Sequence, residues 1–255
     1  MVLLPPGGGS ATVGEGERVI LWEGPGSLQA AFAVPGRRVD NKHGTFDCGA
    51  WVGALWGSKA VSRSGRGWVW LLRPTAELWT KALKHRTQIL YAADIAQVVA
   101  QLDLRPGEVV LESGTGSASL THSLARAVSP GGHVITLEFH AERASEARRE
   151  VEESGLGRLV TVVHWDTERW GFPRSLRGRA DAVVLDLPGP HKVVGSAKEC
   201  LRPAGRFCAF SPCIEQVGRT ADALRLAAFA EVKAMELLLR EHEVREVAFR
   251  GDFAA

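Results

Sequence analysis

Cysteine is scarce in this chain, with four residues among 255, and the four are irregularly spaced. Cys48, Cys200, Cys208 and Cys213 include no CxxC pair, so neither a disulfide framework nor a cysteine metal site is expected. This cysteine usage is typical of a reducing compartment. We predict no metal centre.

Long apolar runs are also missing. No run approaches the ~20 residues that a membrane helix needs. The first residues lack a basic region followed by an apolar stretch, so no secretory signal is expected. Hydrophobic residues make up 45% of the chain and charged residues 24%, which is ordinary for a soluble globular protein.

Charge is nearly balanced overall, with a formal net charge of +2, but it is unevenly distributed. Residues 1–90 carry 11 Lys/Arg against 6 Asp/Glu, whereas residues 91–255 carry 20 against 23. A basic front half indicates a surface that meets a polyanion. Chance clustering on a solvated surface is the alternative that charge alone leaves open.

Residues 1–80 predict a small β-rich domain, of which 1–16 are expected to be loose. This region holds six of the eight tryptophans and many glycines. Short apolar stretches separated by Gly, Pro and charged residues indicate strands at 18–22, 28–34 and 67–72.

Residues 81–255 predict an α/β domain. Apolar residues recur at helical spacing over 89–102, and strands and helices then alternate. The strands are expected at 108–112, 133–138, 159–164, 182–187, 206–211 and 232–239, with a turn at 202–205 and helices through 128, over 140–155, through 201 and over 214–229. Several βα units in a row predict a doubly wound parallel sheet that binds its ligand at the strand carboxyl ends.

The first strand of this series runs into a glycine-rich turn, Glu112 to Ser119. A dinucleotide fingerprint would place its third glycine at 119, where this chain has serine. An acid two residues before Gly114 suits instead a cationic, amine-bearing cofactor without a pyrophosphate. Glu138 ends the second strand, 22 residues after Gly116, where an acid can accept both ribose hydroxyls. A tight βα turn without a ligand is the alternative interpretation of the glycines.

The fourth strand leads to Asp186, which lies in a turn stiffened by Pro188 and Pro190. This carboxylate is expected to face the same crevice as the glycine turn. It could orient a base through its exocyclic amine and stabilise the positive charge that develops when a ring nitrogen is methylated. A helix N-cap is the alternative role for the aspartate.

Several motifs resemble those of one family, the catalytic subunits of the tRNA methyltransferase that forms 1-methyladenosine in the T-loop. The resemblance covers roughly residues 44–247, and His85–Tyr91 (HRTQILY) and Ser211–Val217 (SPCIEQV) are its most specific stretches. Further matching stretches are Gly57–Lys59, Leu72–Trp79, the glycine turn, Glu138–His140 and Leu185–Pro188.

The resemblance implies a class I, Rossmann-like methyltransferase domain behind a small N-terminal β-rich domain. It implies S-adenosyl-L-methionine as cofactor, N1 of the T-loop adenine (position 58) of tRNA as the methyl acceptor, and Asp186 as the catalytic residue. The cofactor contacts carried over to this sequence are Gln88, Leu90, Glu112, Gly114, Gly116, Ser117, Ala118, Ser119, Glu138, Arg143, Asp166, Thr167 and Asp186. Asp166 is expected to read the adenine amino group of the cofactor.

The same resemblance implies a nuclear enzyme that binds tRNA together with a homologous non-catalytic subunit in a heterotetramer. A homotetramer, as in prokaryotic relatives, is the alternative. Two departures from the family stand out: Ala118 occupies the place of a third glycine, and the last, antiparallel strand is either missing or replaced by residues 243–249. A non-catalytic RNA-binding subunit and a small-molecule methyltransferase are the competing functions.

Cationic residues of the first half are candidates for phosphate contacts: Arg37, Arg38, Lys42, Lys59, Arg63, Arg66, His85 and Arg86. Two interpretations of the tryptophans at 51, 56, 68 and 70 remain open. They stack on bases, or they form the core of the small domain, which the shared strand face of Trp68 and Trp70 favours.

Overall fold

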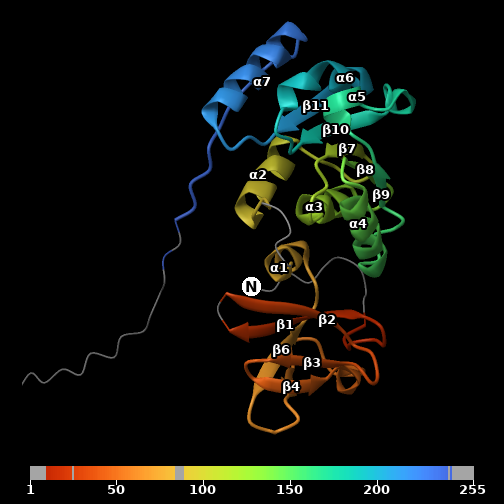
Figure 1. The fold of residues 1–255 in the computed structure, drawn as a ribbon, viewed down its shortest axis with the longest axis vertical. Helices are drawn as coiled ribbons and strands as arrows, with labels where there is room; N and C mark the ends of the chain where they lie inside the picture. Colours follow the sequence, from red (N-terminus) through yellow and green to blue (C-terminus); the bar gives the residue numbers. More distant parts are fainter. Residues whose placement is uncertain (1–9, 25, 84–88, 241, 243–255) are drawn as a thin grey trace, which may run out of the picture.

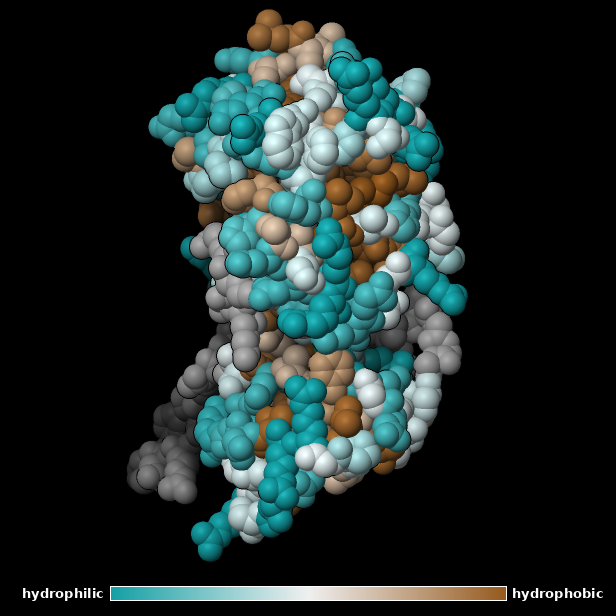
Figure 2. Space-filling view, turned by 45° about the vertical axis from the view of Figure 1, so that its right-hand side comes forward, coloured by the Kyte–Doolittle hydropathy of each residue, from teal (hydrophilic) through white to brown (hydrophobic). Residues whose placement is uncertain are grey.

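The computed structural model describes residues 10–24, 26–83, 89–240 and 242. These residues form an N-terminal part of antiparallel strands and a C-terminal part built on a parallel sheet, stacked along the long axis of the molecule (Figure 1). In Figure 2 both parts have a largely hydrophilic surface, with a patch of apolar residues on the upper one. No helix of the described ranges is long and apolar enough to cross a membrane.

The N-terminal part contains a four-stranded antiparallel sheet in the order β2-β1-β6-β5. Its core forms where one sheet face meets a two-stranded ribbon and a short 3-10 helix: Val19 and Leu21 of β1 cluster with Phe46 and Trp51. The elements are β1 (Arg18–Gly24), β2 (Ser27–Phe32), β3 (Arg38–Asn41), β4 (Gly44–Asp47), η1 (Cys48–Trp51), β5 (Lys59–Val61) and β6 (Trp68–Leu72). The β-rich character predicted for this region is confirmed.

Helix α1 (Ala76–Ala82) covers part of the other face of this sheet. Thr75 begins the helix, because its hydroxyl accepts a hydrogen bond from the Leu78 N–H at 3.2 Å. Trp79 then packs against Ile20 of β1, and Leu72 of β6 borders the same cluster. Helix α1 therefore lies between the antiparallel sheet and the C-terminal part (Figure 1).

A chain of buried polar contacts joins the two parts. The guanidinium of Arg18, in β1, donates to Ser154 Oγ and to Glu153 Oε2, both at 2.8 Å, and lies 4.2 Å from the Trp79 ring centroid. His122 Nε2 lies 3.1 Å from the same Ser154 Oγ. Burial lowers the pKa of His122 to about 4, so the imidazole is neutral at pH 7.

The C-terminal part is a five-stranded parallel sheet in the order β11-β10-β7-β8-β9. From β7 the chain first adds β8 and β9 on one side, and it then adds β10 and β11 on the other side of β7. This reversal creates a topological switch point between β7 and β10. The strands are β7 (Val109–Ser113), β8 (His133–Glu138), β9 (Val160–His164), β10 (Ala180–Leu185) and β11 (Leu201–Ala209). The predicted α/β class is confirmed.

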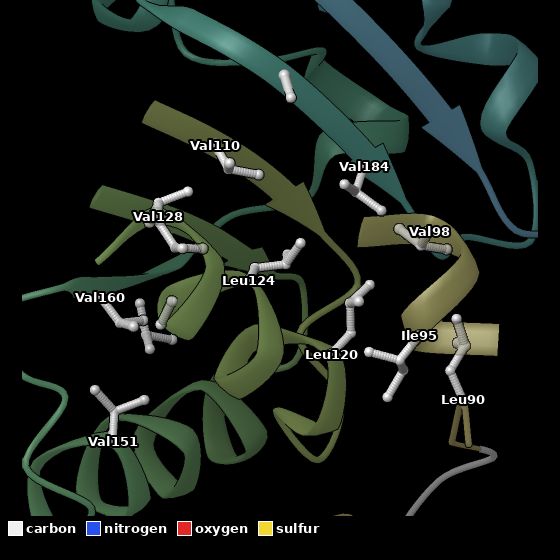
Figure 3. Packing of buried hydrophobic residues seen from close by; sticks show 14 of the residues in the cluster. Leu90, Ile95, Val98, Val110, Leu120, Leu124, Val128, Val151, Val160 and Val184 are labelled. Atoms are coloured by element: carbon white, nitrogen blue, oxygen red, sulfur yellow. The ribbon is translucent and has the colours of Figure 1, made fainter. Parts of the chain in front are cut away.

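Apolar clusters cover both faces of this sheet. Val110 and Val184 pack with side chains of α2, α3 and α4 (Figure 3), whereas Leu111 and Leu185 face the opposite cluster. Burying a side chain of this size contributes about 1.5–3 kcal/mol. The helices are α2 (Ala92–Gln101), α3 (Ser119–Val128), α4 (Ala141–Glu153), α5 (Thr167–Trp170), η2 (Arg174–Leu176), η3 (Pro190–Lys192), α6 (Val194–Cys200) and α7 (Ile214–Leu226).

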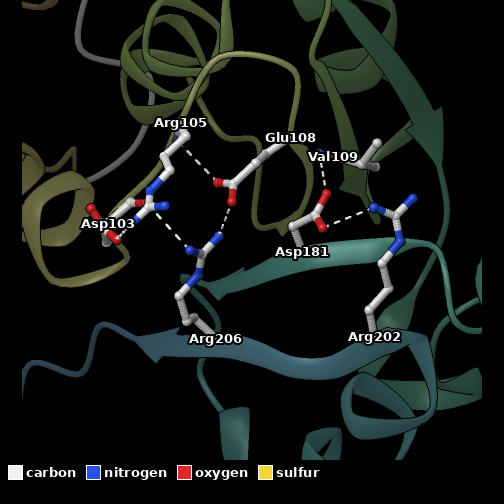
Figure 4. Close-up of polar contacts among 7 residues, drawn as sticks. All are labelled: Asp103, Arg105, Glu108, Val109, Asp181, Arg202 and Arg206. Atoms are coloured by element: carbon white, nitrogen blue, oxygen red, sulfur yellow. Dashed lines mark hydrogen bonds and ion pairs between the residues drawn. The ribbon is translucent and has the colours of Figure 1, made fainter.

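Ion pairs fasten the sheet at the amino ends of its strands (Figure 4). Arg206 of β11 contacts Glu108 at 2.6 Å, and Arg202 contacts Asp181 at 2.8 Å. The second carboxylate oxygen of Asp181 accepts a hydrogen bond from the Val109 N–H at 2.8 Å. These contacts hold β7, β10 and β11 in register at the end of the sheet that is remote from the glycine turn.

Two predictions about the end of the chain need correction. Residues 232–239 are apolar enough to suggest a strand, but they join no sheet, and Leu238 is 87% exposed. The turn predicted at 202–205 lies inside β11 as an irregularity, with Ala204 at a φ of 62°.

Residues 243–249, the possible substitute for a last strand, lie outside the described ranges. The boundary near residue 80 stays a prediction.

The tryptophans divide between core and surface. Trp51 is 2% exposed and belongs to the core of the N-terminal part, and Trp56 packs against that core. Trp68 is 42% exposed, and Trp70 is half-buried on the same strand face. The core interpretation is therefore wrong for Trp68 and Trp70, because the residues of β6 that face the core are Val69 and Leu71.

Candidate functional site

A pocket of about 590 Å³ opens at the carboxyl ends of β7, β8, β9 and β10, beside the switch point. Its volume is in the range of small-molecule sites. The residues that line it end these four strands or follow them: Ser113, Gly114 and Gly116; Leu137 to Phe139 and Arg143; Trp165 to Arg169; and Asp186 to Pro188 with Lys192. A larger hollow lies between the N-terminal sheet and α4, but the glycine turn does not line it.

Gly114 brings the turn into direct contact with the segment after β10. Its φ of +103° is unfavourable for other residues, and a Cβ placed there would lie 2.1 Å from the Asp186 carbonyl oxygen. Gly116 also has a left-handed φ, of 52°. A side chain at Gly114 would fill the space where the two strand ends meet, so this glycine allows the two segments and a ligand to approach the main chain closely.

Glu112, the first residue of the glycine turn, belongs to β7 and is completely buried. Its Oε2 accepts a hydrogen bond from the Thr121 hydroxyl at 2.6 Å, whereas Oε1 has no partner among the described residues. Burial raises the pKa of this carboxyl to about 7, against the opposing effect of hydrogen bonds from Thr121 and Thr136. An unsatisfied carboxylate oxygen in this position favours a cationic group nearby.

Glu138, at the end of β8, is 2% exposed and holds the turn in place. Its Oε2 accepts a hydrogen bond from the Gly116 N–H at 3.0 Å. Its Oε1 accepts from Arg143 at 2.8 Å and from the His140 N–H at 3.0 Å. Oε2 thus keeps capacity for a second donor, such as a ribose hydroxyl, while Oε1 is fully occupied.

Asp166 and Thr167 follow β9. The Asp166 carboxylate caps helix α5 by accepting a hydrogen bond from the Arg169 N–H at 3.1 Å. The Thr167 hydroxyl accepts one from Ser113 at 2.9 Å, which ties α5 to the end of β7. Both residues line the pocket.

The segment after β10 carries Asp186. Its N–H donates to the Ser113 carbonyl at 2.9 Å, so the main chain is fixed beside β7. Burial raises the pKa of the Asp186 carboxyl to about 6, and no described residue donates a hydrogen bond to this carboxylate. Asp186 is not a helix N-cap, because η3 begins after Gly189. The carboxylate is therefore available to a ligand.

Two side chains hold the segment after Asp186 from either side. Glu168 of α5 accepts a hydrogen bond from the Gly189 N–H and lies 3.5 Å from Lys192 Nζ. Gln216 of α7 donates to the Pro188 carbonyl at 2.9 Å. Sequence reasoning missed both roles, although Gln216 lies within the SPCIEQV stretch.

The structure brings most of the predicted cofactor residues together. Seven of them line the pocket: Gly114, Gly116, Glu138, Arg143, Asp166, Thr167 and Asp186. Five others lie close in sequence or space but do not line it: Leu90, Glu112, Ser117, Ala118 and Ser119. Gln88 lies outside the described residues.

Ala118, which departs from the family pattern, is fully buried at the start of α3. It adopts a left-handed φ of 57°, a conformation in which glycine is favoured. His122 Nδ1 lies 2.7 Å from the Ala118 carbonyl oxygen. Ala118 is not among the residues that line the pocket.

The chemistry of the pocket fits a cationic cofactor such as S-adenosylmethionine. Glu138, Asp166, Glu168 and Asp186 contribute carboxylates to its lining, beside the cations Arg143, Arg169 and Lys192. Arg143 is paired with Glu138 and Lys192 with Glu168, so Asp166 and Asp186 have no ion-pair partner among the described residues. The two glycines leave main-chain groups accessible. Among the described residues no cluster of His, Cys, Asp or Glu could hold a metal ion.

Comparison with known proteins places this geometry in context. Residues 67–252 match the family model described as "tRNA methyltransferase complex GCD14 subunit". The tRNA (adenine(58)-N(1))-methyltransferase catalytic subunit of Dictyostelium discoideum is 38% identical over 91% of this chain and 75% of its own length. The corresponding protein of Cryptococcus neoformans is 40% identical over 90% of this chain, which spans only 53% of that relative.

Solved structures agree on the fold. A SAM-dependent O-methyltransferase from Thermotoga maritima superimposes with a TM-score of 0.81 at 27% identity, over 91% of this chain and 86% of its own. A tRNA (m1A58) methyltransferase from Aquifex aeolicus gives a TM-score of 0.74 at 23% identity, over 92% and 90% of the two chains. The Rossmann-like methyltransferase fold with an N-terminal β-rich region is thus confirmed.

Proposed function

The chain belongs to the tRNA methyltransferase complex GCD14 subunit family, and we propose that it is the catalytic subunit that methylates N1 of adenine 58 in tRNA. The observation that carries this proposal is Asp186, a partly buried carboxylate that shares one pocket with the glycine turn and accepts no hydrogen bond from the described residues. A subunit that only bound RNA would not need this pairing. The names of the curated relatives support the same activity.

S-adenosyl-L-methionine, when bound, supplies an electrophilic methyl group. Gly114, Gly116 and Glu138 would hold it along the turn, with Asp166 and Thr167 on the opposite wall. The carboxyl of Glu112 would contribute negative charge from below. Asp166 and Asp186 are the carboxylates of the lining that have no ion-pair partner among the described residues, and they suit the amine and the sulfonium of this cofactor.

Asp186 is the residue that we propose acts on the base. Adenine N1 attacks through its lone pair, so a new N–C bond forms while the electrons of the broken S–C bond stay on sulfur, and no proton has to leave N1. Asp186 accepts a hydrogen bond from the exocyclic amine, which orients the ring, and its negative charge stabilises the cationic methylated base. Glu168 and Gln216 keep the Asp186 segment in position.

The family description names a subunit of a complex, which supports a partner chain. We propose tRNA as the substrate and a homologous non-catalytic subunit as the partner in a heterotetramer, with a homotetramer as the alternative. A nuclear location belongs to the same proposal. Native mass measurement of the isolated chain, and of the chain co-expressed with its partner, distinguishes the two assemblies.

The decisive experiment is methyl transfer to unmodified tRNA, with and without the partner subunit. Asp186→Asn preserves shape but removes the charge, and it should lower kcat about 100- to 1,000-fold at saturating cofactor. If the variant retained full activity, Asp186 would not be catalytic. No cofactor binding to the assembled wild type would favour an RNA-binding subunit, and equal activity on free adenosine would favour a small-molecule enzyme.

A further inference from the structure

One stretch of the N-terminal part carries charge of a single sign. Between Asp47 and Glu77 there is no acidic residue, while Lys59, Arg63 and Arg66 all fall in this stretch together with Arg73. Such a segment suits a polyanionic partner. The methyl-transfer site described above does not involve it.

The β5–β6 hairpin presents part of this stretch as an aromatic surface. Cross-strand pairing of Lys59 with Trp70, and of Val61 with Trp68, places these four residues on one sheet face. We call this set, Lys59, Val61, Trp68 and Trp70, the tryptophan face. Val61 is 62% exposed and Trp68 is 42% exposed, so the face is open to solvent.

Lys59 contributes a cation to this aromatic surface. Its ammonium lies 4.0 Å from the Trp68 ring centroid and 5.1 Å from that of Trp70. The two indoles pack edge to face, with centroids 5.8 Å apart. No carboxylate of the described residues pairs with Lys59 or Arg66, and Arg63 lies 3.6 Å from Asp47. Proteins bind unpaired nucleotides through surfaces of this kind, where aromatic rings stack on bases and nearby cations contact phosphates.

The tryptophan face lies on the same side of the sheet as α1. Leu72 follows Trp68 and Trp70 at alternate positions of β6, and it borders the cluster that α1 covers. Helix α1 in turn lies toward the C-terminal part (Figure 1). The tryptophan face therefore belongs to the sheet face that is directed toward the C-terminal part.

We propose that the tryptophan face binds RNA, by stacking an unpaired base on Trp68 while Lys59 and Arg66 contact neighbouring phosphates. The inference rests on the proposed function for the identity of the RNA, which is the substrate tRNA. Stacking supplies affinity that tolerates different bases, and the cations make binding depend on salt. Arg37, Arg38 and Lys42 lie in or beside β3 and are not part of this surface.

Binding of unmodified tRNA to the full chain, in its assembled form and without cofactor, tests the proposal. Trp68→Leu keeps an apolar side chain but removes the ring, and it should weaken binding about 5- to 100-fold. Trp68→Phe should restore most of the affinity. Lys59→Gln should reduce the slope of log affinity against log salt by about one, whereas the control Lys233→Gln, exposed beyond α7, should leave it unchanged.

The outcomes separate RNA from a protein partner and from the catalytic proposal. Unchanged tRNA affinity of Trp68→Leu would overturn the inference, and a simultaneous change in native mass would identify the face as a subunit contact. In methyl transfer, Trp68→Leu should raise the KM for tRNA and leave kcat and cofactor affinity unaltered. If the wild type bound tRNA through this face but transferred no methyl group, the proposed function alone would fail.

Discussion

Replacement of Gly114 by alanine should disrupt both folding and cofactor binding. The left-handed φ of +103° costs an alanine about 1–3 kcal/mol. The added Cβ would also lie 2.1 Å from the Asp186 carbonyl oxygen, so the two segments must separate by about 1.3 Å to reach an ordinary contact. Overpacking of this kind adds about 1–3 kcal/mol, which gives a total loss of about 2–6 kcal/mol. Urea unfolding measures this loss in the free energy of unfolding.

A second glycine separates backbone strain from overlap. Gly107 has a similar φ of +92°, but a Cβ there would meet no atom within 4 Å. Gly107→Ala should therefore lose only the strain of about 1–3 kcal/mol and bind cofactor normally. Gly114→Ala should in addition lower methyl transfer at least about 100-fold, because a shift near 1 Å misplaces the reacting groups. The reasoning would be refuted if Gly107→Ala and Gly114→Ala were equally stable in urea unfolding and bound the cofactor with equal affinity in titration calorimetry.

Three further predictions concern charged groups. Because burial raises the pKa of Asp186 to about 6, kcat should rise with pH through about 6 as the carboxylate forms, and the residual rate of Asp186→Asn should show no such step in a pH profile. The pKa of Glu112 rises from 4.5 to about 7 in the folded protein, so its contribution to stability, about 3 kcal/mol, is present below pH 4.5 and lost as the pH rises through about 7. Urea unfolding at several pH values should show Glu112→Gln gaining on the wild type over this range; parallel curves would contradict the assignment. Arg18→Met should lose about 2–4 kcal/mol of unfolding free energy, whereas Arg38→Met, which breaks an exposed ion pair, should lose less than about 1 kcal/mol; equal losses would show that burial of Arg18 is unimportant.

The sequence predicted the strands of the parallel sheet well, because each is a short apolar run bounded by turn residues. The strand expected at 133–138 coincides with β8, and that expected at 159–164 differs from β9 by one residue. The error at 232–239 has a physical reason: an apolar run shows that a segment could pair, but not whether it docks on a sheet edge. Likewise, the local turn at Ala204 was visible, but the pairing of Leu201 with Ala180 was not.

Much of the candidate site was also predictable, since parallel strand ends meet at one edge of a sheet. This rule brought Glu138, Asp166 and Asp186 to one pocket. The contact of Glu168 with the Gly189 N–H joins residues 21 apart, and no local pattern encodes such a contact. Ala118 shows the converse limit, because its place in the motif did not indicate that it would be buried outside the pocket lining.

The buried contacts around Arg18 bear on how modular this molecule is. Arg18 in the N-terminal sheet and His122 in α3 meet at one hydroxyl, that of Ser154, and His122 also reaches the main chain at Ala118. The N-terminal part is therefore not an independent module that could be replaced by cutting the chain at one linker. A chimaera with a different N-terminal part would have to keep β1 and Arg18. Without them, the contacts of His122 near the start of α3 would lose the guanidinium that the N-terminal part contributes.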